Sequence, residues 1–524
     1  MKERLAVLGG TLISTGGNLA EYAIGLCVSI VIARTLGPDD FGIFSYAIWL
    51  SGTLYFFANH GVSVTTIRFT ADSRGRGDLA TARAVGERLS RVQWLSLLLV
   101  LVGFVAIAWY IRPSHWAEAT PYFIALIAVS VVCKSRYVFL VGVALGHQRY
   151  LFSALAPVVS ALVYLLASLA VRHQHPTPLM FLCAYALSAV SGFAVIGIAL
   201  ARGGLSVQRG PVSDELRKRV RLNLGLTAGL AVLSLAANRT VETFALSSLG
   251  TASEIGFFAI AGTLTKGAVD ILTAGMQATL MPVMAHASAK RGTAELGPMF
   301  NTAMRYYWFI GLVISGAGAL LARPLVLIVY GTPYAPAIVP VQLTIAGAGL
   351  AIVGSVIGAF LTTQDRQDDR VRAAAWTLAW NCLLAALLVP YFGLIGASLT
   401  FALVRIGSTT IALRYFLRAA MLRIEFAPLR RMAYAWLVGL AAALAPMLSL
   451  HARWGGFVSA AVLLSIGIPL TVLLRCWYRA DYDLFLAIID KLGLRVPTLV
   501  TRVEAVRDRF SADLDAELAV SGSE

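Results

Sequence analysis

Long apolar runs separated by short polar connections fill almost the whole of this chain. Each run reaches the length of about 20 residues that a helix needs to cross a bilayer. The pattern therefore predicts fourteen membrane-spanning helices, which we place at residues 8–34, 41–62, 91–111, 119–146, 150–171, 178–201, 222–248, 255–284, 306–329, 337–361, 372–391, 393–413, 432–450 and 455–475.

The composition agrees with this pattern. Of the 524 residues, 58% are hydrophobic and 13% are charged, whereas about a quarter of the residues in a soluble domain are charged. We therefore expect an all-α, multi-pass membrane protein with little room for a soluble domain. The polar tail at residues 479–524 is the one sizeable exception. Its helical spacing suits either a surface-lying amphipathic segment or a solvated one.

Basic residues are unevenly distributed along the chain. The 43 lysines and arginines outnumber the 27 acidic residues, and such an excess also occurs in proteins that bind nucleic acid. Here, however, 33 of the basic residues fall in alternate connections and five in the others. This bias is the positive-inside signal, and it predicts that both termini lie in the cytoplasm. The connections on the outer side are all short.

An internal repeat divides the predicted helices into two groups. Residues 36–44, LGPDDFGIF, recur as residues 249–258, LGTASEIGFF, about 214 positions later. Each copy joins a first span to a second span with the same topology, which predicts a parallel repeat of six helices. We therefore expect an N-terminal lobe at 1–201, a cytoplasmic linker at 202–221, a C-terminal lobe at 222–416, two extra helices within 417–478 and a cytoplasmic tail at 479–524.

Charged side chains inside the predicted spans are the sharpest functional signal in the sequence. Each costs roughly 2.5–3.5 kcal/mol at the bilayer centre, so such residues persist where they face a cavity or a partner. Lone basic residues in a cavity suit an anionic ligand, and the arginine fork suits phosphate in particular. The candidate substrate-binding residues are Arg239, Lys266, Arg405, Arg136 and Lys134, and the candidate ion-coupling residues are Glu21, Asp270 and Glu242.

Spacing separates local pairs from isolated charges. Arg239 and Glu242 are three residues apart, and Lys266 and Asp270 are four apart, so each pair shares a helix face and can also simply neutralise itself. Arg405 has no acidic neighbour within one turn. Glu21 needs a partner from another helix or a bound proton. Lys134 and Arg136 point in nearly opposite directions on a helix, so only one of them can face a central cavity well.

Several enzyme and metal signatures are missing from the sequence. It contains neither a GxxxxGK[ST] loop nor an HExxH motif, which makes ATP hydrolysis within this chain improbable. None of the five cysteines belongs to a CxxC pair, so the sequence predicts neither a metal site nor a disulfide framework. We expect no bound cofactor. Transport would then be coupled to a flow of protons or sodium ions.

The segment at residues 32–44, IARTLGPDDFGIF, and the helix that ends at Gly61-Val62-Ser63 resemble the opening of the polysaccharide-transport family of oligosaccharide flippases, the Wzx type. Residues 249–258, followed by Met281-Pro282, resemble the seventh and eighth helices of that family. Residues 330–335, YGTPYA, and residues 391–397, YFGLIGA, match its turns. The resemblance covers about residues 5–475, and it implies a two-lobed bundle of the multidrug/oligosaccharidyl-lipid/polysaccharide flippase superfamily.

The resemblance implies a function, a cargo and a location. Helices 1, 2, 7 and 8 would line a central cavity between two lobes. The cargo would be an oligosaccharide on undecaprenyl pyrophosphate, moved from the inner to the outer leaflet of the bacterial inner membrane by alternating access. Membrane lipids, a polysaccharide polymerase and glycosyltransferases would be the partners, and nucleic acid would not. The protein would be a transporter without catalytic residues.

Two alternatives stay open at this point. A multidrug or cation exporter can have the same fold, although its cavity should favour acidic over basic side chains. A membrane glycan polymerase or ligase is a different class of protein. Such an enzyme usually needs an outside domain or a large outside loop, and the sequence predicts neither.

Overall fold

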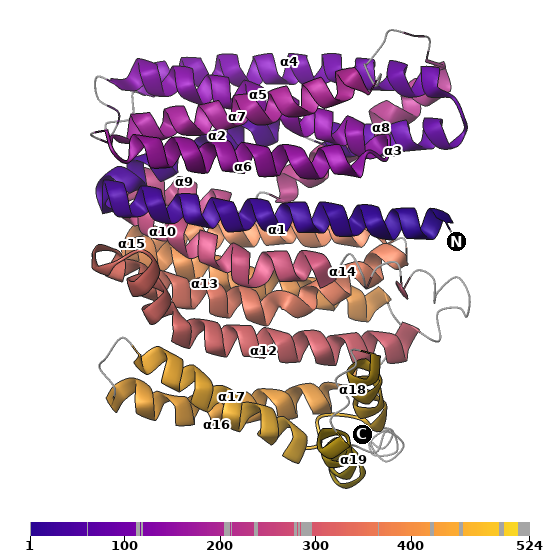
Figure 1. Ribbon diagram of the computed structural model, residues 1–524, viewed down its shortest axis with the longest axis vertical. Coiled ribbons are helices and arrows are strands. Elements are labelled where there is room, and N and C mark those ends of the chain that lie inside the picture. The colour runs from indigo at the N-terminus through magenta and orange to yellow at the C-terminus, as the bar shows by residue number, and fades with distance from the viewer. Residues whose placement is uncertain are drawn as a thin grey trace. The chain divides into compact units, whose positions relative to one another are not determined.

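The computed structural model describes residues 2–59, 61–111, 119–174, 176–203, 212–234, 239–276, 296–364, 366–419, 424–449, 454–491 and 497–511, with a few single positions between these ranges. Within them the chain forms helices and turns and contains no β-strand, which confirms the all-α prediction (Figure 1). The helices are α1 (Lys2–Leu36), α2 (Pro38–Asn59), α3 (Val62–Gly75), α4 (Leu79–Ile111), α5 (Thr120–Gly146), α6 (Tyr150–Val171), α7 (Pro178–Arg202), α8 (Asp214–Leu233), α9 (Thr240–Leu249), α10 (Ala252–Thr265), η3 (Lys266–Asp270), α12 (Leu296–Val329), η5 (Thr332–Ala337), α13 (Ile338–Leu350), η6 (Ala351–Val353), α14 (Gly354–Thr363), α15 (Gln367–Ala419), α16 (Phe426–Ser449), α17 (Gly455–Leu473), α18 (Arg479–Lys491) and α19 (Pro497–Phe510).

Eleven helical stretches among the described residues are long and apolar enough to cross a membrane. The stretch Asp368–Arg418 includes two of the predicted spans, 372–391 and 393–413. A kink at Gly393 of α15, with φ 50° and ψ −124°, separates them. On α4, Leu95, Leu99 and Val102 are each at least 60% exposed. A continuous apolar face of this kind belongs in lipid rather than in water, so the chain is a multi-pass membrane protein.

The predicted span at residues 222–248 is not one helix, and this prediction was wrong. Helix α8 ends at Leu233, and α9 begins at Thr240. Arg239 precedes α9 with φ 58°, in the left-handed region that non-glycine residues rarely adopt. A further irregularity follows α10, where residues Lys266–Asp270 form a π-helix. Both irregularities lie in segments that carry candidate charges.

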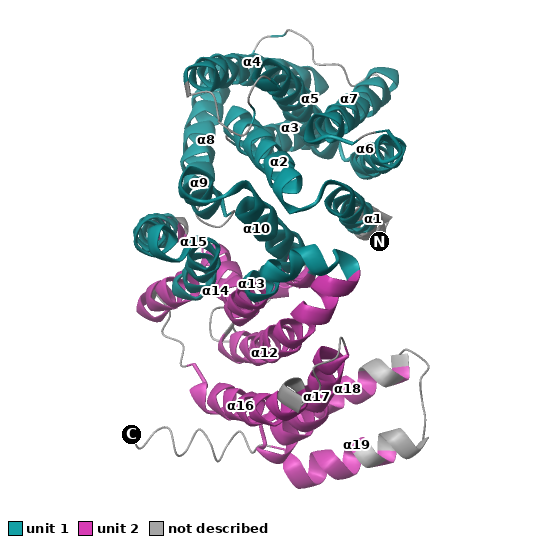
Figure 2. Cartoon of the chain, turned by 90° about the vertical axis from the view of Figure 1, so that its left-hand side faces the viewer, with its two compact units in different colours: residues 1–267, 329–341, 371–407 teal, residues 268–328, 342–370, 408–524 magenta. Residues whose placement is uncertain are grey.

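The chain divides into two compact units, each described here by itself (Figure 2). Unit 1 comprises Met1–Gly267, Val329–Val341 and Val371–Gly407, and unit 2 comprises Ala268–Ile328, Gln342–Arg370 and Ser408–Glu524. The division into six-helix lobes at 1–201 and 222–416 stays a prediction. Residues 204–209 and 211 of the predicted linker, and residues 512–524 of the tail, lie outside the described part of the chain.

In unit 1, α1 packs along α6, α5 along α7, and α2 along α10. One apolar cluster, which includes Phe123, Ile127 and Leu182, joins α2, α4, α5 and α7, and a second cluster includes Phe139 and Ile196. In unit 2, α16 packs along α17, and their apolar side chains meet those of α12. The packing in unit 1 matters most for function, because it surrounds a cavity.

Candidate functional site

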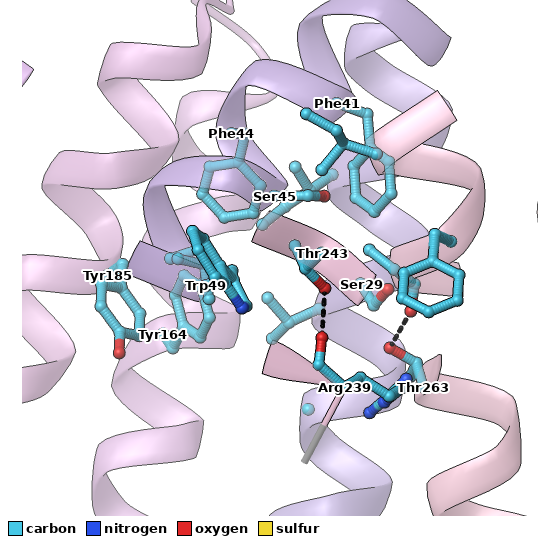
Figure 3. A pocket seen from close by; sticks show the side chains of 17 residues that line it. Ser29, Phe41, Phe44, Ser45, Trp49, Tyr164, Tyr185, Arg239, Thr243 and Thr263 are labelled. Carbon is cyan, nitrogen blue, oxygen red and sulfur yellow. Dashed lines mark hydrogen bonds between the residues drawn. The ribbon is translucent and has the colours of Figure 1, made fainter. Parts of the chain in front are cut away.

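A cavity of about 300 Å³ lies inside unit 1 (Figure 3). Helices α1, α2, α6, α7, α9 and α10 supply its walls, together with Arg239 directly before α9. Aromatic rings, aliphatic side chains and small hydroxyl groups make up most of the surface. The lining residues are Gly25, Val28, Ser29, Ile32, Phe41, Phe44, Ser45, Ile48, Trp49, Tyr164, Tyr185, Arg239, Thr243, Ile255, Phe258, Ala259 and Thr263.

Arg239 is the charged side chain among the described residues that line this cavity. It has a left-handed backbone conformation directly before the first residue of α9. Its carbonyl accepts a hydrogen bond of 2.8 Å from the Thr243 hydroxyl. The guanidinium lies against Gly262 of α10, where an added Cβ atom would stand 1.1 Å from Nη1. Only glycine leaves room for the guanidinium there. Backbone strain held at one residue is a common feature of functional sites.

Three of the candidate charges come together around Arg239. The guanidinium carbon of Arg239 lies 5.8 Å from the centre of the Phe401 ring, and that of Arg405 lies 5.1 Å from the same ring. Glu242 is completely buried and interacts electrostatically with both arginines. Asn381 of α15 lies beside the Glu242 carboxylate. The arrangement sets two cations against one buried carboxylate at the edge of the cavity.

Lys134 and Glu21 form a second charged group in unit 1. Their side chains interact electrostatically although they lie on α5 and α1, so Glu21 has the partner from another helix that its sequence context requires. The Lys134 ammonium lies 5.7 Å from the ring centre of Tyr137 and 5.6 Å from that of Tyr185. Tyr185 lines the cavity, so Lys134 is one residue away from it.

Arg136 lies in a different environment and is not among the described residues that line the cavity, so its assignment as a substrate-binding candidate stays a prediction. It is 8% exposed and donates hydrogen bonds to Ser90 (3.1 Å) and to Gln93 Oε1 (2.6 Å) of α4. The Gln93 amide donates in turn to Asn59 Oδ1 and to the Ser135 carbonyl, at 2.9 and 2.6 Å. Arg136 thus ties α2, α4 and α5 together, because a buried guanidinium must find acceptors.

Lys266 and Asp270 both lie on the π-helix η3, and neither is among the described residues that line the cavity. Lys266 is exposed. Next to it, the Tyr22 hydroxyl donates to the Thr263 carbonyl at 2.9 Å and occupies the space where Gly267 has no side chain. Short π-helices recur at functional sites, which supports keeping Lys266 and Asp270 as candidates. Their role in transport stays a prediction.

The aromatic part of the cavity was missed at the level of sequence. On α2 the lining positions Phe41, Phe44, Ser45, Ile48 and Trp49 follow the spacing of three and four residues that defines one helix face. The lining positions of α1 follow the same spacing. This spacing is present in the sequence, but the candidate substrate-binding and ion-coupling residues are all charged, so this face of α2 is not among them.

Comparisons with known proteins place the fold and the family. A family model described as "Polysaccharide biosynthesis protein" matches residues 7–288, which is more than half of the chain. No curated protein matches the sequence. Among solved structures, the lipid II flippase MurJ in an inward closed conformation is similar with a TM-score of 0.68 and 12% identity, covering 88% of this chain and 99% of that one.

Two further structures agree with this fold. An inward-facing multidrug resistance transporter of the MATE family has a TM-score of 0.62 and 17% identity, covering 76% of this chain and 93% of its own. A transporter of the MOP superfamily from Pyrococcus furiosus, noted for the reverse polarity of its binding pocket, has a TM-score of 0.56 and 16% identity over 79% and 94%. The chain thus shares its fold with these three structures, and by its match to the family model it belongs to the polysaccharide biosynthesis protein family.

Proposed function

We propose that this protein is a flippase for glycan repeat units linked to undecaprenyl pyrophosphate. It would move them from the inner to the outer leaflet of the bacterial inner membrane, with both termini in the cytoplasm. The observation that carries the proposal is the position of Arg239, which presents a guanidinium to a cavity whose other described walls are aromatic, aliphatic and hydroxyl-bearing. The family supports a role in polysaccharide synthesis, and the related folds support transport.

The physical problem of such a cargo explains why a cavity of this kind is needed. Sugars and a pyrophosphate cannot cross hydrocarbon, because they would leave their hydrogen bonds with water unreplaced. The lipid tail can stay in the bilayer throughout. By its size, a cavity of about 300 Å³ accommodates the pyrophosphate end of the head group rather than a whole repeat unit. The two predicted lobes would expose this end alternately to each side of the membrane.

Within this mechanism, Arg239 would hold the pyrophosphate, and Glu242 would couple its release to an ion. Anionic cargo competes with the Glu242 carboxylate for the same guanidinium, because Glu242 interacts electrostatically with Arg239 and Arg405. A proton or a sodium ion on Glu242 removes this competition and frees Arg239 for the cargo. Lys134 with Glu21, and Lys266 with Asp270, are the further candidates for cargo contact and ion exchange.

The test is export in a strain whose only copy of the gene is a variant. Arg239→Ala should abolish the appearance of the glycan at the cell surface and leave lipid-linked repeat units in the inner leaflet, while Arg239→Lys should retain part of the activity because Lys keeps the charge but not the fork. Arg414→Ala, an exposed arginine on α15, is the matched control. Wild-type export by Arg239→Ala, at equal protein level in the membrane, would overturn the proposal.

A multidrug exporter is the second candidate, favoured by the similarity to the MATE transporter. Its cationic substrates would be repelled by Arg239, so we rank it below the flippase. Growth of a deletion strain on a panel of cationic drugs separates the two, since only the exporter predicts hypersensitivity. A glycan polymerase or ligase ranks below both, because the similar solved structures are those of a flippase and of transporters.

A further inference from the structure

Three aromatic side chains form one side of the cavity. Trp49 lies on α2, Tyr164 on α6 and Tyr185 on α7, and all three are lining residues. In Figure 3 they lie together, on the side of the view away from Arg239 and Thr263. The cavity therefore has an aromatic wall, defined here as Trp49, Tyr164 and Tyr185, that is separate from its cationic end.

The rings of this wall are fixed in orientation by their neighbours. Tyr46 stacks on Trp49 with ring centres 5.6 Å apart and an angle of 28° between the planes. Trp116 packs against Tyr46 at 6.1 Å and so extends the contact into the apolar core. Tyr164 and Tyr185 meet edge to face at 5.7 Å. Because their neighbours already fix these rings, little conformational entropy is lost when a ligand binds to them.

Trp49 also carries a hydrogen-bond donor without an acceptor. Its indole nitrogen is buried and has no hydrogen-bond partner among the described residues, and Figure 3 shows this nitrogen pointing toward the middle of the lining side chains. A buried donor left without an acceptor costs free energy, which a ligand oxygen would recover. The wall thus offers aromatic faces together with the unpaired indole donor of Trp49.

A sugar ring matches both features. Its axial C–H groups make an apolar face that packs on an aromatic ring, and its hydroxyl oxygens, at the edge of the same ring, accept hydrogen bonds. A planar cation would use the rings alone and would leave the indole N–H unpaired, and it would be repelled by Arg239. An aliphatic chain would likewise leave the donor without a partner.

We propose that the aromatic wall is a subsite for the sugar that follows the pyrophosphate of the cargo, with the Trp49 N–H donating to one of its hydroxyl groups. This inference rests on the proposed function, because Arg239 at the other end of the cavity is taken to hold the pyrophosphate. The subsite recognises the sugar nearest the lipid, so it selects for the sugar that starts the repeat unit and is indifferent to those further along.

The experiment compares two kinds of soluble probe, without and with a sugar, on the full-length protein in lipid nanodiscs by isothermal titration calorimetry. Farnesyl pyrophosphate carries the anion without a sugar, and farnesyl pyrophosphates bearing glucose, galactose or N-acetylglucosamine carry both. In the wild type, at least one sugar-bearing probe should bind about tenfold more tightly than farnesyl pyrophosphate, the factor expected from one hydrogen bond and one ring contact.

The variants divide this gain into its parts. Trp49→Leu should abolish it, and Trp49→Phe, which keeps a ring but lacks the N–H, should retain part of it. The affinity of each variant for farnesyl pyrophosphate, which carries no sugar, is the reference against which this gain is measured. Trp109→Leu, which changes an exposed tryptophan of α4 outside the cavity, is the control and should behave as the wild type.

The outcomes separate the two proposals. If no sugar-bearing probe gains affinity over farnesyl pyrophosphate, or if the gain survives in Trp49→Leu, the sugar subsite is wrong while the flippase proposal stands. If farnesyl pyrophosphate itself fails to bind the wild type, or binds equally well to Arg239→Ala, the assignment of Arg239 fails first. Binding of ethidium that depends on Trp49 would assign the wall to planar cations and overturn the subsite.

Discussion

Gly42 of α2 and Gly256 of α10 pack against each other, and they are equivalent positions of the two repeat copies. A Cβ atom on Gly256 would stand 3.1 Å from the Gly42 nitrogen and 3.2 Å from its Cα. A Cβ atom on Gly42 would stand 1.7 Å from the Ala252 carbonyl oxygen. In the predicted parallel repeat, equivalent positions meet at the axis that relates the copies, so this contact is where that axis would cross α2 and α10. The cavity lies directly beside it, since Phe41 and Ile255 line it.

The close approach at Gly42 leads to the first prediction. Gly42→Ala should destabilise the protein, because the new methyl group meets backbone atoms of α10 and these cannot rotate away. Overpacking of this kind costs typically 1–3 kcal/mol, and we expect a lower melting temperature in detergent together with reduced export. Gly103→Ala on α4 is the control, since a Cβ atom there meets nothing within 4 Å. An unchanged melting temperature in Gly42→Ala would contradict the close packing of α2 on α10.

The second prediction concerns Glu242, which is buried beside two arginines. Glu242→Gln keeps the shape of the side chain but removes its ability to carry a charge or to take up a proton. We expect this variant to insert and fold, and its transport to lose any response to an imposed gradient. The measurement is translocation of a fluorescent lipid-linked sugar into proteoliposomes under a pH or a sodium gradient. A gradient response equal to that of the wild type would remove Glu242 from the coupling mechanism.

Helix positions were predictable where the local sequence marks both ends. The predicted span at 150–171 coincides with α6 (Tyr150–Val171), and that at 178–201 with α7 (Pro178–Arg202). In α7, Thr177 caps the helix and Pro178 stands at its first position, where the missing N–H of proline has no consequence. By contrast, the break before α9 depends on the left-handed backbone of Arg239. The mean hydropathy of the residues around it does not reveal the backbone conformation of a single residue.

The partners of the buried charges could not be read from spacing. Periodicity reports neighbours on the same helix, yet Arg136 bonds to Gln93 across 43 positions. Arg405 interacts with Glu242, which lies in a segment far earlier in the chain. Such contacts follow from tertiary packing. Of the candidate charged residues, Glu21 and Lys266 are exposed and the others are wholly or partly buried, and their roles stay predictions. Which of them face the cavity could be seen only once the helices were placed.

The third prediction concerns a buried ion cluster in unit 2. Arg305 of α12 is 4% exposed and contacts Asp481 of α18 at 3.0 Å and Glu425 at 3.4 Å. The Tyr306 hydroxyl donates to Asp481 at 2.6 Å, and the Tyr478 hydroxyl donates to Glu425 at 3.0 Å. The cluster ties the start of the C-terminal tail to α12, so the tail helix α18 is anchored rather than independent.

Arg305→Gln should therefore destabilise unit 2 strongly, because Asp481 would stay buried without its cation. Breaking a buried pair in this way costs roughly 3–5 kcal/mol. We expect a lower melting temperature and faster proteolytic cleavage after α17. Arg507→Gln is the matched control, since its ion pair with Asp483 (2.8 Å) lies at the surface, with the Asp483 side chain 53% exposed, and exposed pairs contribute little to stability. Equal losses in the two variants would contradict the anchoring role of Arg305.

The last prediction is a pH dependence set by His147, at the end of α5. The residue is 4% exposed, and its carbonyl accepts a hydrogen bond from Arg74. Burial, together with the positive charges of Arg74, Arg83 and Arg149, lowers the pKa of the imidazole from its ordinary value of 6.5. The folded protein therefore favours neutral His147, while the unfolded chain takes up a proton once the pH falls below about 6.5.

Because the unfolded state then binds more protons, the stability contributed by neutral His147 is complete above about pH 7 and declines as the medium is acidified toward the lowered pKa. The melting temperature of the wild type in detergent should fall between pH 7 and pH 5, and His147→Gln should show a smaller fall, since glutamine takes up no proton. His173→Gln, which changes an exposed histidine after α6, should keep the full dependence. A profile for His147→Gln that parallels the wild type at every pH would show that the acid sensitivity arises from other groups, and that His147 is not held neutral by its arginine neighbours.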